Sequence, residues 1–234
     1  MTEGLNRRTL MEGVGVAVAA AAAMPSSAAR AQAAPAAYEM KPLPIDPAAV
    51  PGMSERLIVS HYENNYGGAV RRLNAIAAQL ANLDWAAAPN FVVNGLKREE
   101  LIAANSMILH EHFFAALGGG GGNPPGALGQ AITRDFGSVE RWQGQFSAMG
   151  RAQGGGSGWV ILGYSPRDGR LVNCWASDHT TTLAGGRPVL VLDMYEHAYH
   201  MDYGAAAAGY VDAYMANVRW AEAAELYERY TRQA

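Results

Sequence analysis

The chain has 234 residues, of which half are hydrophobic and 17% are charged, so it is long enough to bury a substantial core in one large domain or two small ones. Its formal net charge is −3, and no run rich in Lys and Arg follows the first residues, which argues against nucleic-acid binding through a basic face. Cys174 is the only cysteine, which excludes an intramolecular disulfide, an all-cysteine zinc site and a cysteine-ligated iron–sulfur cluster.

Residues 1–33 are predicted to be an export signal. Arg7 and Arg8 precede an apolar run over 14–24 that is too short and too weakly hydrophobic to span a membrane comfortably. The Ala-Gln-Ala at 31–33 supplies the small-x-small pattern that a signal peptidase needs. The paired arginines resemble a twin-arginine signal, which exports folded proteins, whereas the simpler interpretation is an ordinary Sec signal. Both predict a periplasmic protein, with no membrane segment after signal removal.

The segment that follows is predicted to be an extended arm and then a helix. Residues 34–52 are rich in Ala and Pro, which favours an arm without regular structure. Apolar residues then recur at helical spacing from about Met53 to Asp84. Gly67 and Gly68 interrupt this pattern, and we expect a local weakness of about 1 kcal/mol per glycine relative to alanine.

A second helix is predicted to begin near Lys97, where two glutamates in the first turn suit the helix dipole. Its inner face would carry Ala103, Met107, His110, Phe114 and Leu117. The five glycines of 118–122, followed by Asn-Pro-Pro-Gly, end this helix sharply. We therefore predict a helical hairpin domain over 53–117 and a Gly/Pro linker over 118–126.

The remaining part, residues 127–234, contains strand-like as well as helical patterns and is predicted to be a C-terminal α+β domain. The sequence favours short helices at 130–136 and 139–150, strands at 159–164, 170–176 and 188–193, and a last helix over about 209–232. The first two strands flank a Ser-Pro-Arg-Asp-Gly turn and form a hairpin. The predicted fold class is α+β, with a helical hairpin followed by a domain that contains a three-stranded antiparallel sheet.

The run Asp193-Met-Tyr-Glu-His197 is the most informative stretch for chemistry. An aspartate that leaves an apolar strand, with a histidine four residues later, can offer one oxygen and one nitrogen ligand from a single corner. Histidines on two helices could supply the rest, and three imidazoles with one carboxylate suit iron or manganese with an open position. Taken alone the pattern is weak, because a single histidine on an apolar helix face is more often a packed core residue.

The same run, extended to Tyr199, resembles the Asp-x-Trp-Glu-His-Ala-Tyr signature of the iron/manganese superoxide dismutases, with Tyr195 in place of the Trp. Other segments occur in the family's order and approximate spacing: Phe136-Gly137-Ser138, Gly156-Ser157-Gly158-Trp159, the Gly-rich linker, and Val218-Arg219-Trp220, which is similar to the family's Val-Asn-Trp. The resemblance covers about residues 40–231.

This resemblance implies that His61, His110, Asp193 and His197 hold one iron or manganese ion per subunit. It implies that the protein converts superoxide to oxygen and hydrogen peroxide by one-electron cycling of that metal. It also implies a homodimer in which Glu196, at the interface, hydrogen-bonds the ligand histidine of the opposite subunit. The partners expected are therefore superoxide and a second copy of the chain, and no nucleic acid.

Several residues around the implied site depart from the family's pattern. His179 stands where most relatives have a Gln that touches the bound solvent, and its simpler interpretation is a surface-loop histidine. Ala69 replaces the gateway Tyr, so Tyr66 or ordered water would have to compensate in proton delivery. Asn65 and His200 replace the usual cross-dimer partners. The family's pocket Trp and its Asn-x-Arg segment are replaced by Phe114 and by Ala205-Ala206-Ala207.

Two other functions compete with the dismutase. One is a periplasmic protein of the same fold that holds its metal but has little activity, which the missing Tyr and Arg favour. The other is a hydrolytic zinc enzyme, for which Glu196 is the one obvious general base. The four intact ligands favour the dismutase, and the altered surroundings predict a reduced rate.

Overall fold

The computed structural model describes residues 37–233 of the chain. The predicted export signal lies outside these residues, as does the beginning of the arm. Within the described part, no helix combines the length and the hydrophobicity needed to cross a membrane.

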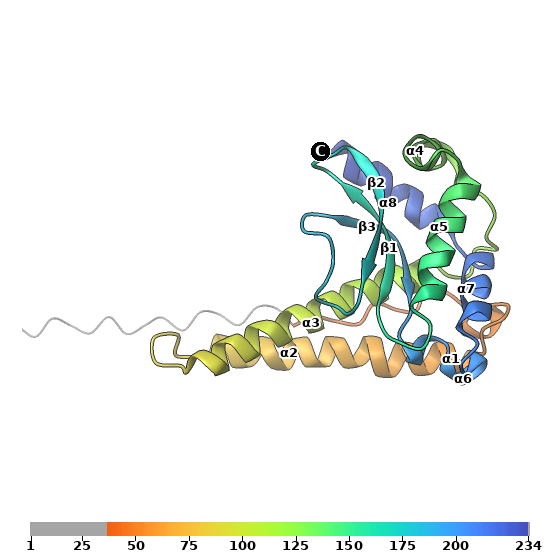
Figure 1. Cartoon of the computed structure of the whole chain (residues 1–234). Coiled ribbons are helices and arrows are strands. Elements are labelled where there is room, and N and C mark those ends of the chain that lie inside the picture. The colour runs from red at the N-terminus through yellow and green to blue at the C-terminus, as the bar shows by residue number, and fades with distance from the viewer. Residues whose placement is uncertain (1–36, 234) are drawn as a thin grey trace, which may run out of the picture. The chain divides into compact units, whose positions relative to one another are not determined.

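The first half begins with an arm that contains one 3-10 turn, Pro47–Ala49, and continues as one long helical rod (Figure 1). The rod consists of α1 (Glu55–Ser60), a π-helical turn (His61–Tyr66) and α2 (Gly67–Ala81). Ser54 caps its start, because the Ser54 hydroxyl accepts a hydrogen bond from the Leu57 amide at 3.1 Å. The local weakness expected at the two glycines stays a prediction: Gly67 and Gly68 are the first residues of α2, and the irregularity in the rod is the π turn before them.

The arm itself explains why small residues begin α2. A Cβ added to Gly67 would lie 3.0 Å from the sulfur of Met40. The arm therefore crosses the helix so closely that a side chain at this position would push it away. The crossing is fixed by hydrogen bonds: the Lys41 amide donates to the Tyr66 hydroxyl at 2.8 Å, and the Tyr62 hydroxyl donates to the Lys41 carbonyl at 2.7 Å. The arm is thereby held against the helical rod.

Helix α3 (Asn90–Ala115) returns alongside α2 and completes the helical hairpin (Figure 1). It begins at Asn90 and not near Lys97, so the predicted start is wrong. The turns between Asn90 and Lys97, which the sequence pattern did not predict, carry little buried apolar surface, and Phe91 is 77% exposed. A helical stripe, which requires buried residues at regular spacing, could therefore not reveal them.

After α3 the glycine run crosses the chain that precedes the last helix. The Gly119 amide donates to the Asn217 carbonyl at 3.0 Å, and the Gly121 amide donates to the Val218 carbonyl at 3.1 Å. A Cβ on Gly119 would lie 2.2 Å from the Cα of Arg219. Glycine is thus required here because two backbone segments touch.

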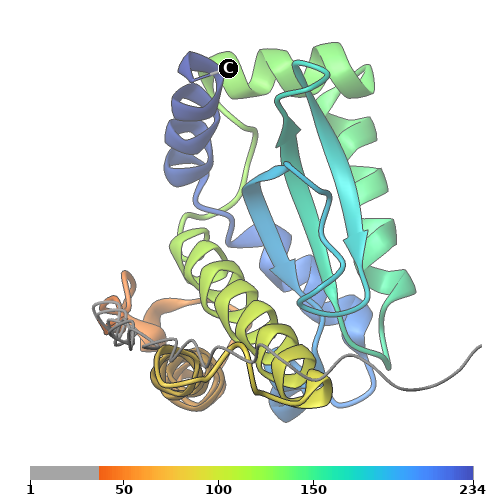
Figure 2. The same ribbon diagram turned by 90° about the vertical axis from the view of Figure 1, so that its left-hand side faces the viewer.

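The second half carries helices on an antiparallel sheet (Figures 1 and 2). Its elements are α4 (Gly126–Phe136), α5 (Val139–Ala152), β1 (Trp159–Ser165), β2 (Arg170–Ala176), β3 (Arg187–Asp193), α6 (His200–Tyr203), α7 (Ala207–Ala216) and α8 (Trp220–Arg232). The sheet has the order β2-β1-β3, and β1 pairs antiparallel with both neighbours. Every residue of the central strand is buried. The predicted α+β fold class with its three-stranded antiparallel sheet is confirmed.

The predicted last helix is in fact two helices, α7 and α8, which are separated at residues 217–219. The side chain of Asn217 donates to the Pro51 carbonyl at 2.7 Å, and the Arg219 guanidinium donates to the Ala115 carbonyl at 2.6 Å. These bonds tie the segment to the first half of the molecule. Arg219 has an extended backbone, with φ −94° and ψ 95°, which a continuous helix would not allow.

Candidate metal centre

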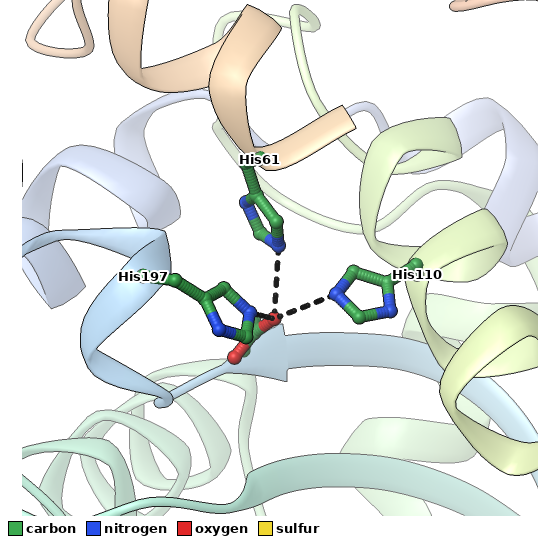
Figure 3. Close-up of side chains that lie close together, drawn as sticks. His61, His110 and His197 are labelled. Carbon is green, nitrogen blue, oxygen red and sulfur yellow. Dashed lines mark hydrogen bonds and ion pairs between the residues drawn. The ribbon is translucent and has the colours of Figure 1, made fainter. Parts of the chain in front are cut away.

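Four side chains from four separate places in the fold meet in one buried cluster. His61 begins the π turn, His110 lies on α3, Asp193 ends β3, and His197 lies in a short 3-10 turn after it. One potential ligand atom from each lies within 4.8 Å of all the others, and Figure 3 shows the three imidazole rings pointing toward one another. The four candidate ligands thus converge as predicted.

The carboxylate of Asp193 lies at the centre of the cluster. Its Oδ2 is 3.1 Å from His61 Nε2, 3.2 Å from His197 Nε2 and 3.5 Å from His110 Nε2. Its Oδ1 accepts a hydrogen bond from the Tyr195 amide at 2.8 Å. The side chain is completely buried, so its orientation is fixed by these neighbours and not by water.

The bonding of His110 shows that the cluster fits a cation. Its Nδ1 donates to the Ser106 carbonyl at 2.6 Å, so the proton is on Nδ1 and the lone pair is on Nε2. Within residues 37–233 this buried Nε2 has no hydrogen-bond partner, and it faces the electron-rich Oδ2 of Asp193. Two facing electron pairs repel unless a cation lies between them. Three imidazole nitrogens and one carboxylate oxygen are a donor set that suits iron or manganese.

The protonation states favour the same conclusion. Burial lowers the pKa of His61, and it lowers the pKa of His110 to about 3. Burial opposes ionisation of Asp193, but the nearby His197 and His61 outweigh this and hold the pKa of that carboxyl well below its usual range. The two buried rings are therefore neutral at neutral pH, as metal binding requires, and the carboxylate is ionised.

The corner that carries Asp193 and His197 depends on a glycine directly before the adjacent strand β1. The Met194 amide donates to the Gly158 carbonyl at 2.9 Å. Gly158 has φ +141°, and a Cβ there would lie 2.1 Å from the Ala176 carbonyl oxygen. No other residue fits this position without moving the ends of the three strands.

His179 lies beside the cluster, in the loop after β2. The Trp159 indole donates to His179 Nδ1 at 3.1 Å, and this places the ring proton on Nε2. The ring is 6.3 Å from the His110 ring, measured between centroids, and it stacks on Tyr195 at 4.7 Å. His179 thus offers an N–H group at the edge of the cluster.

Tyr66, the other residue predicted to take part in catalysis, is buried, and its hydroxyl is hydrogen-bonded. Its hydroxyl accepts from the Lys41 amide and donates to Glu111 at 3.1 Å, so its hydrogen bonds lead toward the arm. Burial is the main cause that raises the pKa of this phenol to about 12. Ala69 is buried on the same helical rod and offers no hydroxyl.

The sequence did not indicate the roles of three residues that support the cluster. Tyr195 lies between two rings, stacked on His179 and on His197 at 5.3 Å. Trp159 is the donor to His179, and Ser106 provides the carbonyl that orients His110. Ser106 could have been found, because it lies four residues before His110 on the same helix. The other two depend on contacts across the sheet.

Comparisons with known proteins agree with this geometry. Residues 124–226 match the family described as iron/manganese superoxide dismutases, C-terminal domain. The iron superoxide dismutase of Cupriavidus metallidurans is 70% identical over 187 residues, which are 80% of this chain and 94% of that protein. Manganese superoxide dismutase 2 of Haloferax volcanii is 35% identical over 82% of this chain and 96% of its own length. The iron superoxide dismutase of Aquifex pyrophilus is 34% identical over 79% of this chain and 89% of its own length.

Proposed function

The chain belongs to the iron/manganese superoxide dismutase family, and from this premise we propose how its own residues perform the reaction. The protein is a superoxide dismutase: two superoxide ions and two protons give oxygen and hydrogen peroxide. The metal, when bound, supplies the one-electron step by alternating between two oxidation states. The metal-holding alternative with little activity is not favoured, because the chain shares 70% identity with a dismutase over most of its length.

We propose that His61, His110, Asp193 and His197 hold the metal and that it is iron. The unpartnered lone pair of His110 supports the ligand assignment, and the Cupriavidus relative, named as an iron enzyme, supports the choice of metal. The role of the protein is to keep one carboxylate and three neutral imidazoles in a fixed arrangement with little water. Metal analysis of protein from its native compartment tests the choice between iron and manganese.

His179 is proposed to donate a hydrogen bond from Nε2 to the solvent molecule or anion on the open side of the site. The support is its tautomer, which the Trp159 indole fixes, and its place 6.3 Å from the His110 ring. A donor in this place stabilises an anionic partner more than a neutral one, and it therefore affects the balance between the two oxidation states.

Proton delivery is proposed to rely on ordered water. Ala69 has no hydroxyl, and the Tyr66 hydroxyl already donates to Glu111. Attraction of the anionic substrate is also expected to be weak, because Arg72 forms an ion pair with Glu99. We therefore expect slower dismutation, with a stronger dependence on pH and salt, than in relatives that keep the gateway Tyr and the arginine.

A two-fold dimer is proposed in which Glu196 contacts His197 of the partner subunit. Glu196 is exposed in the single chain although it is adjacent to a ligand, and such a carboxylate is available to a partner. Sedimentation of the metal-loaded protein and of Glu196→Ala at micromolar concentration tests this. An active, metal-loaded wild-type monomer would contradict the proposal.

Export to the periplasm, by the twin-arginine route, is proposed from residues 1–33 alone. Arg7→Lys together with Arg8→Lys should stop export by that route, because it reads the arginine pair. The measurement is the amount of mature protein in the periplasm, with the first residue of that protein showing where the signal is cleaved. Continued export of the double variant would indicate a Sec signal.

The activity is tested by following pulse-generated superoxide with the metal-loaded protein. Asp193→Ala should lose both the metal and the catalysis. His112→Ala is a matched control, because His112 lies on the same helix as His110 and outside the cluster. If Asp193→Ala kept full activity, or if His112→Ala lost its metal as well, the ligand assignment would be wrong.

A further inference from the structure

A second concave site lies at the far end of the sheet from the metal centre. It is a cleft of about 640 Å³ between the end of α4, the first turns of α5 and strand β2. In the register of the sheet, Leu171 of the cleft pairs with Tyr164, whereas Asp193 pairs with Trp159 at the other end of β1. The two ends are about 17 Å apart at the usual rise of a strand. The cleft is therefore separate from the reaction with superoxide.

A chain of hydrogen bonds fixes the polar groups of this cleft. The Trp142 indole donates to Asn173 Oδ1 at 3.0 Å, and Asn173 Nδ2 donates to Gln145 Oε1 at 2.8 Å. An indole can only donate, so the orientation of both amides follows from it. The oxygen of Gln145 is thus occupied, and among residues 37–233 its two N–H groups have no acceptor. Gln145 lines the cleft and is exposed, so these N–H groups are available to a ligand there.

Positive charge lies beside these donors. Arg141 and Arg170 line the cleft and are exposed, and within residues 37–233 neither guanidinium forms an ion pair or a side-chain hydrogen bond. Asp135 is the carboxylate in the lining, and its oxygens already accept hydrogen bonds within the protein. They accept from the Arg134 guanidinium at 2.6 and 2.7 Å and from the Leu171 amide at 2.7 Å. Its side chain is 6% exposed. The cleft therefore presents donors and cations, with its carboxylate covered.

We propose that this cleft binds the phosphate group of a small phosphomonoester. The two guanidinium groups balance a dianion, and together with the Gln145 amide they supply donors for three terminal oxygens. A single carboxylate has one charge and two oxygens, which one guanidinium satisfies. The cleft has room for an organic group beside the phosphate, and Phe136 in its lining offers that group an apolar surface.

Calorimetric titration of the metal-loaded protein tests the ligand class with four probes: adenosine monophosphate, inorganic phosphate, adenosine and succinate. Adenosine monophosphate is expected to bind, and adenosine and succinate are expected to give no heat. Weaker binding of inorganic phosphate would identify an organic phosphate as the source, and equal binding would identify free phosphate. Succinate or adenosine binding as tightly as adenosine monophosphate would overturn the proposal.

Substitutions locate the site. Gln145→Glu keeps the oxygen that Asn173 donates to and replaces the free N–H groups by a carboxylate oxygen, so affinity should fall at least tenfold. Arg141→Gln and Arg170→Gln should have a similar effect.

Arg56→Gln on α1 makes the same change in net charge outside the cleft and should leave affinity within twofold. All variants should retain superoxide turnover, which shows that they are folded. Unchanged affinity in Gln145→Glu, or an equal loss in Arg56→Gln, would overturn the proposal.

Discussion

For two imidazole rings at the metal centre, a neighbouring group determines which ring nitrogen carries the proton. Each of these neighbours can act only as an acceptor or only as a donor. The Ser106 carbonyl can only accept, so His110 keeps its proton on Nδ1 and presents a lone pair. The Trp159 indole can only donate, so His179 keeps its proton on Nε2 and presents an N–H group. One ring is thereby suited to bind a metal, and the other is suited to donate to what the metal binds.

The role of the Trp159 indole can be tested by Trp159→Phe. This change removes the donor to His179, so the ring can take either tautomer and no longer presents its N–H reliably. We expect the metal content to be retained, the reduction potential to shift, and the rate to fall about 10-fold or more, as for other hydrogen bonds beside metal ligands. Trp175→Phe is the control, because Trp175 lies on the neighbouring strand and is 58% exposed. A potential equal to that of wild type would show that the indole does not control His179.

Gly158 provides a second test at the level of one residue. In Gly158→Ala the new methyl group meets the Ala176 carbonyl oxygen at 2.1 Å in a backbone conformation that alanine disfavours, so we expect a loss of roughly 3 kcal/mol or more in the free energy of unfolding. Metal affinity should fall with it, because the Gly158 carbonyl holds the Met194 amide next to Asp193.

The matched control is Gly95→Ala, in the second turn of α3, where a Cβ meets nothing within 4 Å. This change should stabilise the protein by about 0.5–1 kcal/mol, because alanine favours a helix over glycine. Denaturant unfolding of both variants measures the two effects. A small cost at Gly158 would mean that the strand ends can move apart freely.

At the scale of elements, the last turn of α3 is completed by a residue from the segment between α7 and α8. Arg219, which directly precedes α8, donates from Nε and Nη2 to the Ala115 carbonyl at 2.9 and 2.6 Å. The carbonyls at the end of a helix have no partner within it. A guanidinium there satisfies one of them and also complements the negative end of the helix dipole. The helix that carries His110 is in this way joined to the C-terminal part.

We therefore expect Arg219→Ala to lower the free energy of unfolding by about 1–3 kcal/mol, the usual loss for charged hydrogen bonds. Arg229→Ala, on the exposed side of α8, should change it by less than about 0.5 kcal/mol. Thermal and denaturant unfolding measure both. Equal effects of the two substitutions would show that the contact with Ala115 contributes nothing specific.

The sequence predicted the elements that carry a regular buried pattern, and it failed where tertiary contacts decide the structure. Strand β1 and the carboxyl half of α3 were predicted closely, because their apolar residues recur at the spacing of a strand or a helix. The break between α7 and α8 could not be predicted, since it depends on bonds from Asn217 and Arg219 to residues far away in the chain. The π turn that carries His61 has no such pattern either.

In the candidate site, too, the residues of a continuous motif could be predicted, and those placed by tertiary contacts could not. The motif at Asp193 and His197 lies in one continuous segment, so its resemblance to a known signature could be recognised. His61 and His110 had to be placed by alignment to the family, because a single histidine on a helix indicates no ligand by itself. The supporting side chains remained hidden, since Tyr195 and Trp159 both contact His179, which lies in a loop that the sequence alone does not place beside them.

For the whole molecule, the metal centre joins the two halves of the fold. Two of the four candidate ligands come from the helical hairpin, and the other two come from the corner at the end of β3. A ligand that binds only the folded state stabilises it according to its concentration relative to the dissociation constant, by about 4 kcal/mol at a thousandfold excess.

Removal of the metal with a chelator should therefore lower the melting temperature by about 8–16 °C, given the usual 2–4 °C per kcal/mol for a protein of this size. Adding iron or manganese back should restore it, and Asp193→Ala should not respond to either treatment. Calorimetric scans of the loaded, stripped and reloaded protein make the measurement. An unchanged melting temperature after complete stripping would show that the halves hold together without the ion.

The distribution of the ligands along the chain also has a consequence for synthesis on the ribosome. When the helical hairpin has emerged, the nascent chain has His61 and His110 but not the carboxylate that lies between them in the finished site. Asp193 and His197 are translated long after His110, and they take their places only when β3 has paired with β1. Until then the chain has two imidazoles, a poor chelate, and the full set of four donors forms only when the second half has folded. Metal acquisition therefore follows the folding of that half, and the cell compartment in which the chain completes its fold determines which metal it meets.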